Sequence, residues 1–499
     1  MSRDFSEKLE SFLADNGFIW GPEPEIYGGL SGFYTYGPLG KLLKRNIEDI
    51  IRSNLEKEEF FEIEAPFIQP KKVWEASGHL ETFVDPMISC NQCDSDFRAD
   101  NLIEDKTGVQ ADSFTYEELE EFIENKEIQC PTCGSKKWGN VRDYNLMVKT
   151  EIGKDHEAYN RPETATTTYL PFNRLYNYFR TKTPIKVYQI GKAWRNEISP
   201  RKSVVRGREF TQAEAQILLT DKEEYEVNLE KFEGLKARFL PEIYQEEERD
   251  PEEMNYDELI SQGFVENEGF AYSLFLAVKV FDELCIPKER MRIRQHQENE
   301  RAHYASDAWD VEIYTETYGW IEACGIHDRN DYDLKRHSEH SGREQKIRDE
   351  EGEKVYPKVL EIAFGVDRPL YAILDTYYEE DDRKLFKVPR HLAPIKAGVF
   401  PLVKKDGLPE LAREVFEKLK ESGLRVVYDD SGSIGKRYRR IDEKGAPAGI
   451  TIDYDSKEQK DVTIRDRDSM DQIRVPISEL EDVLREFISG KDLDQLEGR

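Results

Sequence analysis

Residues 185–219 read IKVYQIGKAWRNEISPRKSVVRGREFTQAEAQILL, and this stretch decides the fold class of the chain. Apolar and polar residues alternate in both halves around a basic loop that contains glycine, so we expect an antiparallel hairpin with a long turn. The polar and aromatic side chains of interest on its two arms are Arg195, Asn196, Glu197, Arg206, Arg208 and Phe210. An arginine held on a strand can grip a phosphate through two hydrogen bonds, and an aromatic ring can stack on a base. Taken alone, an Arg-x-Glu pair on a hairpin is more often an ion-pair ladder on the protein surface.

A long helix precedes the hairpin, and a strand-to-helix junction follows it. Apolar residues recur at helical spacing through 38–58, and Pro38 suits a first helical turn. The residues that follow alternate as a strand that ends at Pro66. Further on, a strand over 358–366 runs into a helix through the Gly-Val-Asp-Arg sequence 365–368. There the glycine permits close approach of a ligand, and the arginine can clamp a terminal phosphate.

The length of 499 residues is too great for a single core, and the pattern of elements changes along the chain. Beyond residue 386 strands alternate with helices, which is typical of a separate α/β domain. Segment 221–290 is acidic and predicts mostly helix. We therefore predict an α+β protein with an antiparallel catalytic sheet, two insertions and a C-terminal α/β domain. The predicted segments are catalytic parts 1–88, 146–220 and 291–385, insertions 89–145 and 221–290, and the C-terminal domain 386–499.

The net charge of −30 argues, by itself, against a nucleic-acid partner, because polyanions bind clusters of lysine and arginine. The charge is uneven, however: acid gathers in 221–260, whereas bases gather at 195–208, 288–294 and 436–440. No apolar run approaches the roughly 20 residues that span a bilayer. The N-terminus also lacks the layout of a signal peptide. We expect a cytoplasmic protein with no membrane segment.

Four of the six cysteines form two Cys-x-x-Cys pairs, Cys90 with Cys93 and Cys130 with Cys133. Each pair places two thiolates on one tight turn, and four thiolates together suit a structural zinc ion. The alternatives are reduced thiols in a loop without metal, or a redox pair, for which neither motif has the expected βαβ context. Cys285 and Cys324 are interpreted as small buried apolar residues.

The long helix, the hairpin and the 365–368 junction occur in the order of motifs one, two and three of class II aminoacyl-tRNA synthetases. The chain resembles that superfamily, and within it is most similar to the dimeric glycyl-tRNA synthetases that carry a zinc-knuckle insertion. The resemblance covers about residues 18–485. The stretches that carry it include EIYGGLSGFYTYGPLG (25–40), WEASGH (74–79), RPETA (161–165), GKAWRNEISPR (191–201), REFTQAE (208–214), YGWIEACGIHDRNDYDL (318–334) and IGKRYRRIDEKGAP (434–447).

The resemblance implies ATP-dependent ligation of glycine to tRNA(Gly) through glycyl-adenylate, with Mg²⁺ on the phosphates. It implies that Arg195 binds the α-phosphate, Glu197 the adenine or ribose side and Arg206 the phosphate tail. It further implies that Phe210 stacks on adenine, Glu322 helps to hold ATP or its metal, and Arg368 grips the γ-phosphate. Arg195, Glu197 and Arg368 are the expected catalytic residues. The other expected ATP-site residues are Asn196, Ala323 and Gly365.

For glycine itself, the resemblance implies a small acidic pocket. The carboxylates expected around the amino group, and the other residues expected nearby, are Glu163, Glu214, Glu361, Arg98, Arg329 and Ala363. Three carboxylates would bind one ammonium group and leave no room for a side chain. The sequence departs from the family pattern twice, because Ala363 stands where serine is usual and Thr166-Thr167 stands where Gln-Gly is usual.

The C-terminal domain resembles the anticodon-binding domain of related synthetases, so tRNA contacts are expected from Lys436, Arg437, Arg439 and Arg440. A homodimer is expected because motif one usually lies at the subunit interface in this superfamily. For His296, His303, His327, His337 and His340, hydrogen-bonding or tRNA-contact roles are favoured over a metal site. Two alternatives stay open: a catalytically silent nucleic-acid-binding relative, and a class II synthetase for another amino acid.

Overall fold

The computed structural model describes residues 2–111, 114–154, 156–200, 202–221, 225–298, 300–301, 305–349, 351–380 and 383–497. Its centre is a nine-stranded sheet with the order β13-β12-β14-β15-β16-β19-β11-β10-β3. The long strands of this sheet are β10 (Ile185–Trp194), β11 (Glu209–Leu219), β15 (Asp307–Thr315), β16 (Gly319–Asn330) and β19 (Lys358–Gly365). These five pair antiparallel, so the predicted antiparallel catalytic sheet is confirmed.

The quoted hairpin lies at the centre of this arrangement. Strands β10 and β11 are in register from the Ile185–Leu218 pair to the Trp194–Glu209 pair, which leaves the basic loop at one end. On the next strand pair, Glu214 lies opposite Ala363. Because alternate residues of a strand face the same side, one face of the sheet collects the polar residues of β11, β16 and β19.

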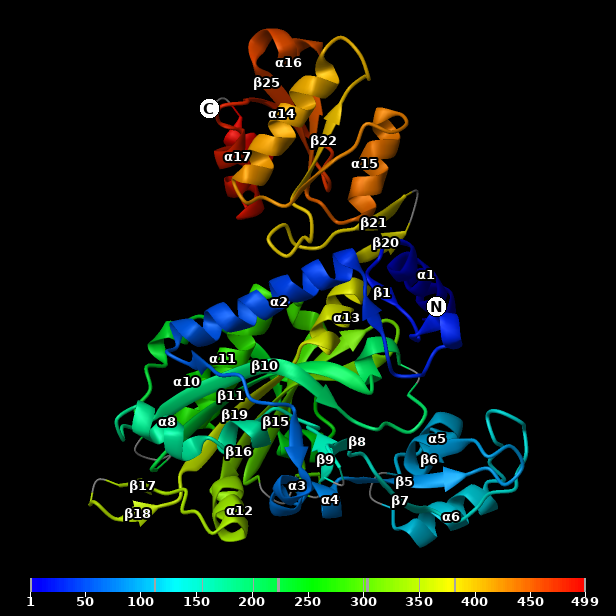
Figure 1. The fold of residues 1–499 in the computed structure, drawn as a ribbon, viewed down its shortest axis with the longest axis vertical. Coiled ribbons are helices and arrows are strands. Elements are labelled where there is room, and N and C mark those ends of the chain that lie inside the picture. The colour runs from blue at the N-terminus through cyan, green and yellow to red at the C-terminus, as the bar shows by residue number, and fades with distance from the viewer. Residues whose placement is uncertain are drawn as a thin grey trace.

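Helices cover the opposite face of the sheet. The long helix predicted over 38–58 is α2 (Pro38–Lys57), and it lies beside α11 (Glu268–Glu283) and α13 (Asp367–Tyr377) (Figure 1). Helix α11 is buried almost all round and packs against β15, β16 and β19. The strand expected before Pro66 is shorter than predicted, since β3 comprises only Phe61–Glu62.

Segment 221–290 is not the mostly helical insertion that its sequence predicts. It contains α9 (Glu242–Glu246), α10 (Tyr256–Ser261) and α11, but also β12 (Ala237–Leu240) and β13 (Glu252–Met254). Strand β12 pairs parallel with β14 (Met291–Gln295), so the segment extends the catalytic sheet at one edge. These strands are too short for alternation to reveal them, and their pairing with a distant strand decides their conformation.

A compact unit follows α3 (Lys71–Ser77) and α4 (His79–Thr82) (Figure 1). Its sheet contains β5 (Val84–Ser89), β6 (Asp96–Arg98) and β7 (Arg142–Asn145), with α5 (Ala99–Thr107) and α6 (Tyr116–Asn125) packed on a small core of its own. A second small sheet, β4-β9-β8, leads back to the hairpin through two short helices. These elements are β4 (Ile68–Pro70), β8 (Lys149–Ile152), β9 (His156–Asn160), α7 (Ala165–Tyr169) and α8 (Phe172–Tyr178).

The C-terminal domain has a five-stranded sheet of order β23-β22-β24-β25-β26 and a separate core. Its strands are β22 (Ala397–Pro401), β23 (Val426–Tyr428), β24 (Ala448–Ile452), β25 (Asp461–Asp466) and β26 (Gln472–Pro476). Its helices are α14 (Leu408–Glu421), α15 (Ile434–Glu443), α16 (Tyr454–Gln459) and α17 (Leu480–Ile488). Parallel pairing of β22 with β23 and β24 agrees with the alternation of strands and helices in the sequence.

Helix α2 joins the two domains. The Asn46 amide donates hydrogen bonds to the carbonyl oxygens of Leu392 (2.7 Å) and Ala393 (3.3 Å), and Arg425 donates to the Asn46 carbonyl oxygen. The remaining elements are α1 (Ser2–Asp15), β1 (Ile19–Trp20), β2 (Thr35–Tyr36), α12 (Tyr332–Ser341), β17 (Ile347–Arg348), β18 (Lys354–Val355), β20 (Tyr378–Glu380) and β21 (Lys384–Phe386). Within the part of the chain that the structure describes, no helix has the length and apolar character needed to cross a membrane.

Candidate active site

A cavity lies over the polar face of β11, β16 and β19. Its free space, including the open mouth, is about 860 Å³. Thirteen of the residues predicted to bind ATP or glycine line it: Glu163, Arg195, Glu197, Arg206, Phe210, Glu214, Glu322, Ala323, Arg329, Glu361, Ala363, Gly365 and Arg368. These residues come from positions far apart in the sequence, and the sheet brings them to one face.

The hairpin supplies one end of this cavity. The Arg195 guanidinium lies between two aromatic rings, 5.4 Å from the Phe210 centroid and 5.3 Å from the Phe83 centroid. Its Nε donates to the Pro162 carbonyl oxygen at 3.2 Å. Glu197 accepts a hydrogen bond from Arg206 Nε at 3.0 Å. The arginine is thus held on a rigid support, as a group that binds a reacting phosphate must be.

Arg368 lines the same cavity from the start of α13. It forms a 3.0 Å ion pair with the Glu322 carboxylate and donates to the Glu322 carbonyl oxygen at 2.8 Å. Burial opposes the charge of Arg368, but the neighbouring Glu322 carboxylate outweighs it and raises the pKa of the arginine. A phosphate entering the cavity would therefore meet a fixed, charged guanidinium.

Asp367, which the sequence reasoning did not assign to the site, fixes the start of α13. Its carboxylate accepts hydrogen bonds from the Thr211 backbone N–H (2.5 Å), from Lys44 and from the Tyr36 hydroxyl. Lys44 and Asp367 are both buried. Although burial opposes it, the Lys44 charge lowers the pKa of Asp367. Burial lowers the pKa of Lys44 in turn. The position of this aspartate in the 365–368 sequence was the available signal.

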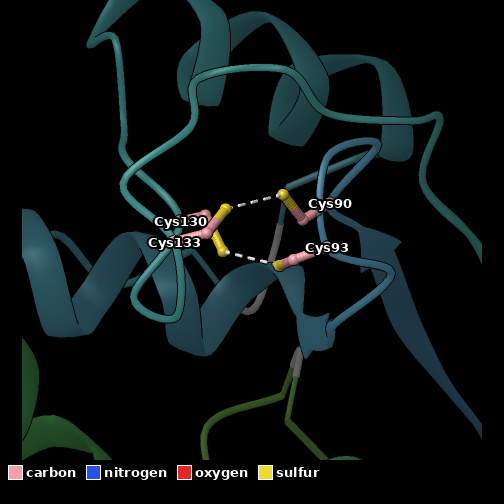
Figure 2. A group of neighbouring side chains, drawn as sticks. All are labelled: Cys90, Cys93, Cys130 and Cys133. Carbon is pink, nitrogen blue, oxygen red and sulfur yellow. Dashed lines mark hydrogen bonds between the residues drawn. The ribbon is translucent and has the colours of Figure 1, made fainter.

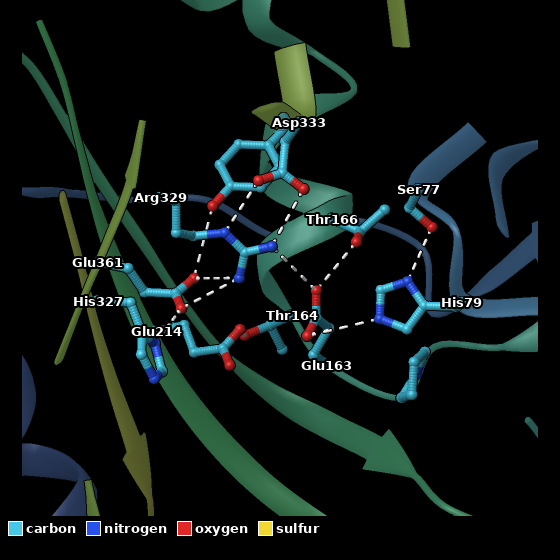
Figure 3. A network of polar contacts seen from close by, with 12 residues as sticks. Ser77, His79, Glu163, Thr164, Thr166, Glu214, His327, Arg329, Asp333 and Glu361 are labelled. Carbon is cyan, nitrogen blue, oxygen red and sulfur yellow. Dashed lines mark hydrogen bonds and ion pairs between the residues drawn. The ribbon is translucent and has the colours of Figure 1, made fainter. Parts of the chain in front are cut away.

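The three predicted glutamates lie close together at the deep end of the cavity (Figure 3). Glu361 lies between Gln216 and His327 on the neighbouring strands. It accepts from Gln216 Nε2 at 2.7 Å and contacts His327 Nδ1 at 2.8 Å. Glu214 accepts a 2.5 Å hydrogen bond from the Thr164 hydroxyl.

Arg329 forms ion pairs with two of these three glutamates, Glu361 and Glu163. Its guanidinium contacts both oxygens of Glu361 at 3.2 Å and forms two hydrogen bonds, of 2.9 and 3.1 Å, with Asp333. Glu163 lies 3.9 Å from the same guanidinium and accepts a 3.0 Å hydrogen bond from the Thr166 hydroxyl. Thr166, one of the departures from the family pattern, therefore contacts a predicted ammonium-binding carboxylate.

The charges of the three glutamates differ. Burial, followed by the nearby charges of Glu361 and Glu163, raises the pKa of Glu214 to about 8. Burial also opposes ionisation of Glu361, but Arg329 and His327 outweigh it and lower the pKa of Glu361 to about 2. The pKa of Glu163 is lowered, because His79, Arg329 and Arg195 outweigh burial. At neutral pH the pocket thus holds two carboxylates and one largely protonated carboxyl group.

Comparison with known proteins agrees with this geometry. A model of the tRNA synthetase class II core domain (G, H, P, S and T) matches residues 148–377, and an anticodon binding domain model matches 396–487. The chain is 39% identical to the glycine–tRNA ligase of Thermococcus gammatolerans, in a match that covers 98% of this chain and 99% of that protein. The chain belongs to the glycine–tRNA ligase family.

Other members of the family, and one more distant structure, agree. The glycine–tRNA ligases of Pyrococcus furiosus and Methanocaldococcus jannaschii are each 38% identical, and the matches cover 98% and 97% of this chain and 100% and 99% of those proteins. Prolyl-tRNA synthetase from Cryptosporidium parvum, solved with halofuginone and AMPPNP, superimposes with a TM-score of 0.59 at 16% identity. That match covers 97% of this chain and 76% of that chain and supports the fold alone. The predicted family and the class II synthetase fold are confirmed, and the chain is an enzyme of this class.

Two predicted site residues of this glycine–tRNA ligase family member lie elsewhere. Among the described residues that line the cavity, neither Arg98 nor Asn196 is present. Arg98 forms ion pairs with Asp100 (2.7 Å) and Asp85 (3.3 Å). The Asn196 backbone N–H donates to the Leu146 carbonyl oxygen at 2.8 Å. In this structure both residues support the walls of the site and do not line it.

The four paired cysteines meet in one cluster (Figure 2). All four sulfur atoms lie within 4.8 Å of one another, with Cys90 3.6 Å from Cys133 and Cys93 3.7 Å from Cys130. In a tetrahedral zinc site with Zn–S bonds of about 2.3 Å, sulfur atoms are roughly 3.8 Å apart. The four free thiols therefore fit a zinc ion in both number and spacing.

In the C-terminal domain, helix α15 divides the four basic residues predicted to contact tRNA. Lys436 and Arg439 are exposed, and within the described part of the chain neither side chain forms a hydrogen bond or ion pair. Arg440 pairs with Asp429 at 2.5 Å. Arg437 requires a correction, because it is 2% exposed and donates to backbone carbonyl oxygens, including those of Asp430 and Gly432. Its guanidinium holds the preceding turn and cannot reach an RNA phosphate.

The histidines have several environments. His296 and His327 each contact a carboxylate, Asp310 at 2.7 Å and Glu361 at 2.8 Å. His337 is buried, and burial lowers its pKa to about 4. His340 is exposed on α12, and His303 lies outside the described residues. His79, which was not singled out, lies 3.6 Å from Glu163.

Proposed function

We propose that this protein ligates glycine to the 3′ end of tRNA(Gly) at the expense of ATP, through a glycyl-adenylate intermediate. The observation that carries the proposal is the joining of two sites in one cavity. The three glutamates Glu163, Glu214 and Glu361 line the same cavity as the arginines Arg195, Arg206 and Arg368. A small ammonium compound and a polyphosphate therefore fit side by side.

In the first proposed step, a carboxylate oxygen of glycine attacks the α-phosphorus of ATP, and the bond to the pyrophosphate oxygen breaks. Arg195 neutralises charge on the α-phosphate, while Arg206 and Arg368 hold the β- and γ-phosphates. Glu163, Glu214 and Glu361 hold the glycine ammonium, so that the carboxylate points toward the phosphates. Positioning of this kind replaces a covalent nucleophile.

In the second proposed step, a ribose hydroxyl of the terminal tRNA adenosine attacks the glycyl carbonyl, and AMP leaves. The exposed Lys436 and Arg439 on α15 are proposed to contact the anticodon arm, because unpaired cations on an exposed helix suit a phosphate backbone. Selectivity for glycine follows from the crowding of the three glutamates, which leaves no volume for a side chain. Ala363 lies on β19, the strand between β11 and β16, and contributes only a methyl group to the cavity lining.

We further propose two metals. Mg²⁺ would accompany the phosphates, with Glu322 and Glu197, which pair with Arg368 and Arg206, as its candidate carboxylate ligands. Zn²⁺ would bind Cys90, Cys93, Cys130 and Cys133 and stabilise the turns of its unit.

A pyrophosphate-exchange assay across the amino acids tests the proposed function, followed by aminoacylation of tRNA(Gly). We expect ATP–pyrophosphate exchange with glycine alone, and glycylation of tRNA(Gly). Exchange with alanine or serine but not with glycine would assign the pocket to another amino acid. Exchange with no amino acid at all would favour a silent nucleic-acid-binding relative.

A further inference from the structure

The turn between α3 and α4 brings two polar side chains behind Glu163, one of the glutamates that line the cavity. Ser77 ends α3 and His79 begins α4, with Gly78 between them at φ 87°. This left-handed conformation favours glycine and reverses the chain sharply. As a result, the Ser77 hydroxyl faces the His79 ring, and the other side of that ring faces Glu163 (Figure 3).

Ser77, His79 and Glu163 form a chain of contacts. His79 Nδ1 lies 2.8 Å from the Ser77 hydroxyl oxygen, and His79 Nε2 lies 3.6 Å from Glu163 Oε2. The imidazole is held by edge-to-face contacts with Trp74 and Phe83, whose centroids are 5.5 and 5.6 Å away. The ring therefore has a fixed orientation, with one nitrogen on serine and the other toward the carboxylate.

The serine orients the imidazole. The Ser77 hydroxyl donates to the Trp74 carbonyl oxygen at 3.4 Å, so its oxygen can accept from Nδ1. When the imidazole carries both ring protons, Nδ1 donates to Ser77 and Nε2 faces the carboxylate. The other Glu163 oxygen already accepts a 3.0 Å hydrogen bond from Thr166. Both oxygens of Glu163 then have a partner that favours the charged form, which agrees with its lowered pKa.

The same turn is braced from behind. Arg336 on α12 donates to the Ala76 carbonyl oxygen at 3.0 Å, which ties α3 to α12. Helix α12 also carries Asp333, the partner of Arg329. Glu163 is thus approached by His79 from one side and by Arg329 from the other, and α12 connects these two supports.

We propose that Ser77 and His79 are positioning residues for glycine recognition: through them, Glu163 is held where it meets the ammonium group and excludes a side chain. This inference rests on the proposed function, because it assigns a role within the same pocket. His79 acts through Glu163 and does not contact the reacting phosphate. Its loss should therefore affect glycine more than ATP.

The test compares His79→Ala, His79→Gln and Ser77→Ala with the control His340→Gln, an exposed histidine on α12. Pyrophosphate exchange is measured against glycine, alanine and ATP concentration. For His79→Ala we expect the KM for glycine to rise roughly tenfold or more, because the buried Glu163 carboxylate loses its ion-pair partner at 3.6 Å. Because His79 acts through Glu163 and does not contact the phosphates, the KM for ATP should stay within about twofold of the wild-type value. The preference for glycine over alanine should fall.

The other variants separate positioning from folding. The amide of His79→Gln can place a donor near the Nε2 position, so it should recover part of the lost glycine affinity. Ser77→Ala should give a smaller loss in the same direction, and His340→Gln none. An unchanged KM for glycine in His79→Ala, or equal losses for glycine and ATP, would overturn the inference. Wild-type enzyme without glycine-dependent exchange would instead overturn the proposed function.

Discussion

At the scale of single residues, the three glutamates of the pocket differ in charge although they share one cavity. Glu214 has its pKa raised to about 8, whereas Glu361 has its pKa lowered to about 2. The difference arises because Arg329 and His327 contact Glu361 directly. For Glu214, burial and the charges of Glu361 and Glu163 outweigh the hydrogen bond from Thr164. The pocket therefore avoids the repulsion of three adjacent anions.

Glycine affinity should consequently depend on pH. Below pH 8 Glu214 is largely protonated, and it must lose that proton to pair with the glycine ammonium. Raising the pH from 6.5 to 8.5 should thus lower the KM for glycine roughly tenfold, as Glu214 becomes ionised. Initial rates of pyrophosphate exchange across this range measure the effect.

Glu214→Gln supplies the control for this pH dependence. Glutamine keeps the size of the side chain and cannot ionise, so the KM should be higher and nearly flat over the same range. A wild-type profile that is equally flat would show that Glu214 does not titrate in the pocket.

Lys44 gives a prediction on stability. The Lys44 side chain is only 3% exposed, and its ammonium group pairs with the buried carboxylate of Asp367. Removing one partner of a buried ion pair leaves the other charge uncompensated, which typically costs about 3–5 kcal/mol. Lys44→Met should therefore lower the unfolding midpoint strongly, as followed by thermal and urea unfolding.

The matched variant is Lys41→Met on the same helix. Lys41 is exposed and forms a 3.4 Å ion pair with Glu48, which should be worth less than about 1 kcal/mol. Equal destabilisation by the two substitutions would contradict the role given to the Lys44–Asp367 pair.

At the scale of elements, the cysteine-bearing unit depends on its four thiols. Its core is small, so a bound metal is expected to supply much of its stability. The purified protein should contain about one zinc ion per chain. Cys93→Ser should remove that zinc and expose the unit between residues 89 and 145 to limited proteolysis.

Cys285→Ser is the control, because Cys285 lies outside the cluster. It should retain zinc by elemental analysis and keep the proteolysis pattern of the wild type. Full zinc content in Cys93→Ser would exclude the four-thiolate site.

Helix α15 separates exposed from buried arginine. Lys436→Gln and Arg439→Gln should each weaken tRNA binding and reduce the slope of log K against log salt by roughly one unit, as expected for a lost phosphate contact. Arg437→Gln should instead lower the unfolding temperature of the C-terminal domain, because several backbone carbonyls lose their donor. An unchanged salt slope in both exposed variants would argue against this helix as the tRNA contact.

The sequence predicts some of these features and not others, for physical reasons. The hairpin, α2 and α13 follow from periodicity, because each is long enough to show its period. The burial of Arg437 does not follow, since a basic run on a helix gives no indication of which carbonyls turn toward it. The pairing of Lys44 with Asp367 joins positions 323 residues apart, a contact that only the folded sheet creates.

At the scale of the whole molecule, the net charge of −30 coexists with a cavity lined by arginines. An RNA partner would thus be repelled by much of the surface and attracted only at selected sites. We also propose a cytoplasmic homodimer. Three large apolar side chains, Ile26 (86% exposed), Tyr27 (84%) and Leu30 (52%), gather in one short segment and suit a subunit interface.

Sedimentation of the purified protein should therefore give about twice the mass of one 58.4 kDa chain. Ile26→Asp combined with Tyr27→Asp should shift the protein toward the monomer, because charge is disfavoured in a buried apolar interface. A wild-type protein that sediments as a monomer at micromolar concentration would contradict the dimer.

Helix α2 limits the length of an RNA that can contact both the catalytic and the C-terminal domain. Lys44 reaches the start of α13 beside Arg368, and Asn46, two residues later, binds the chain that leads into the C-terminal domain. One rigid rod thus sets the distance between the reaction centre and the domain that carries Lys436. A tRNA that contacts both must match the distance that α2 fixes. An RNA with arms of a different length could contact the reaction centre or the C-terminal domain, but not both at once.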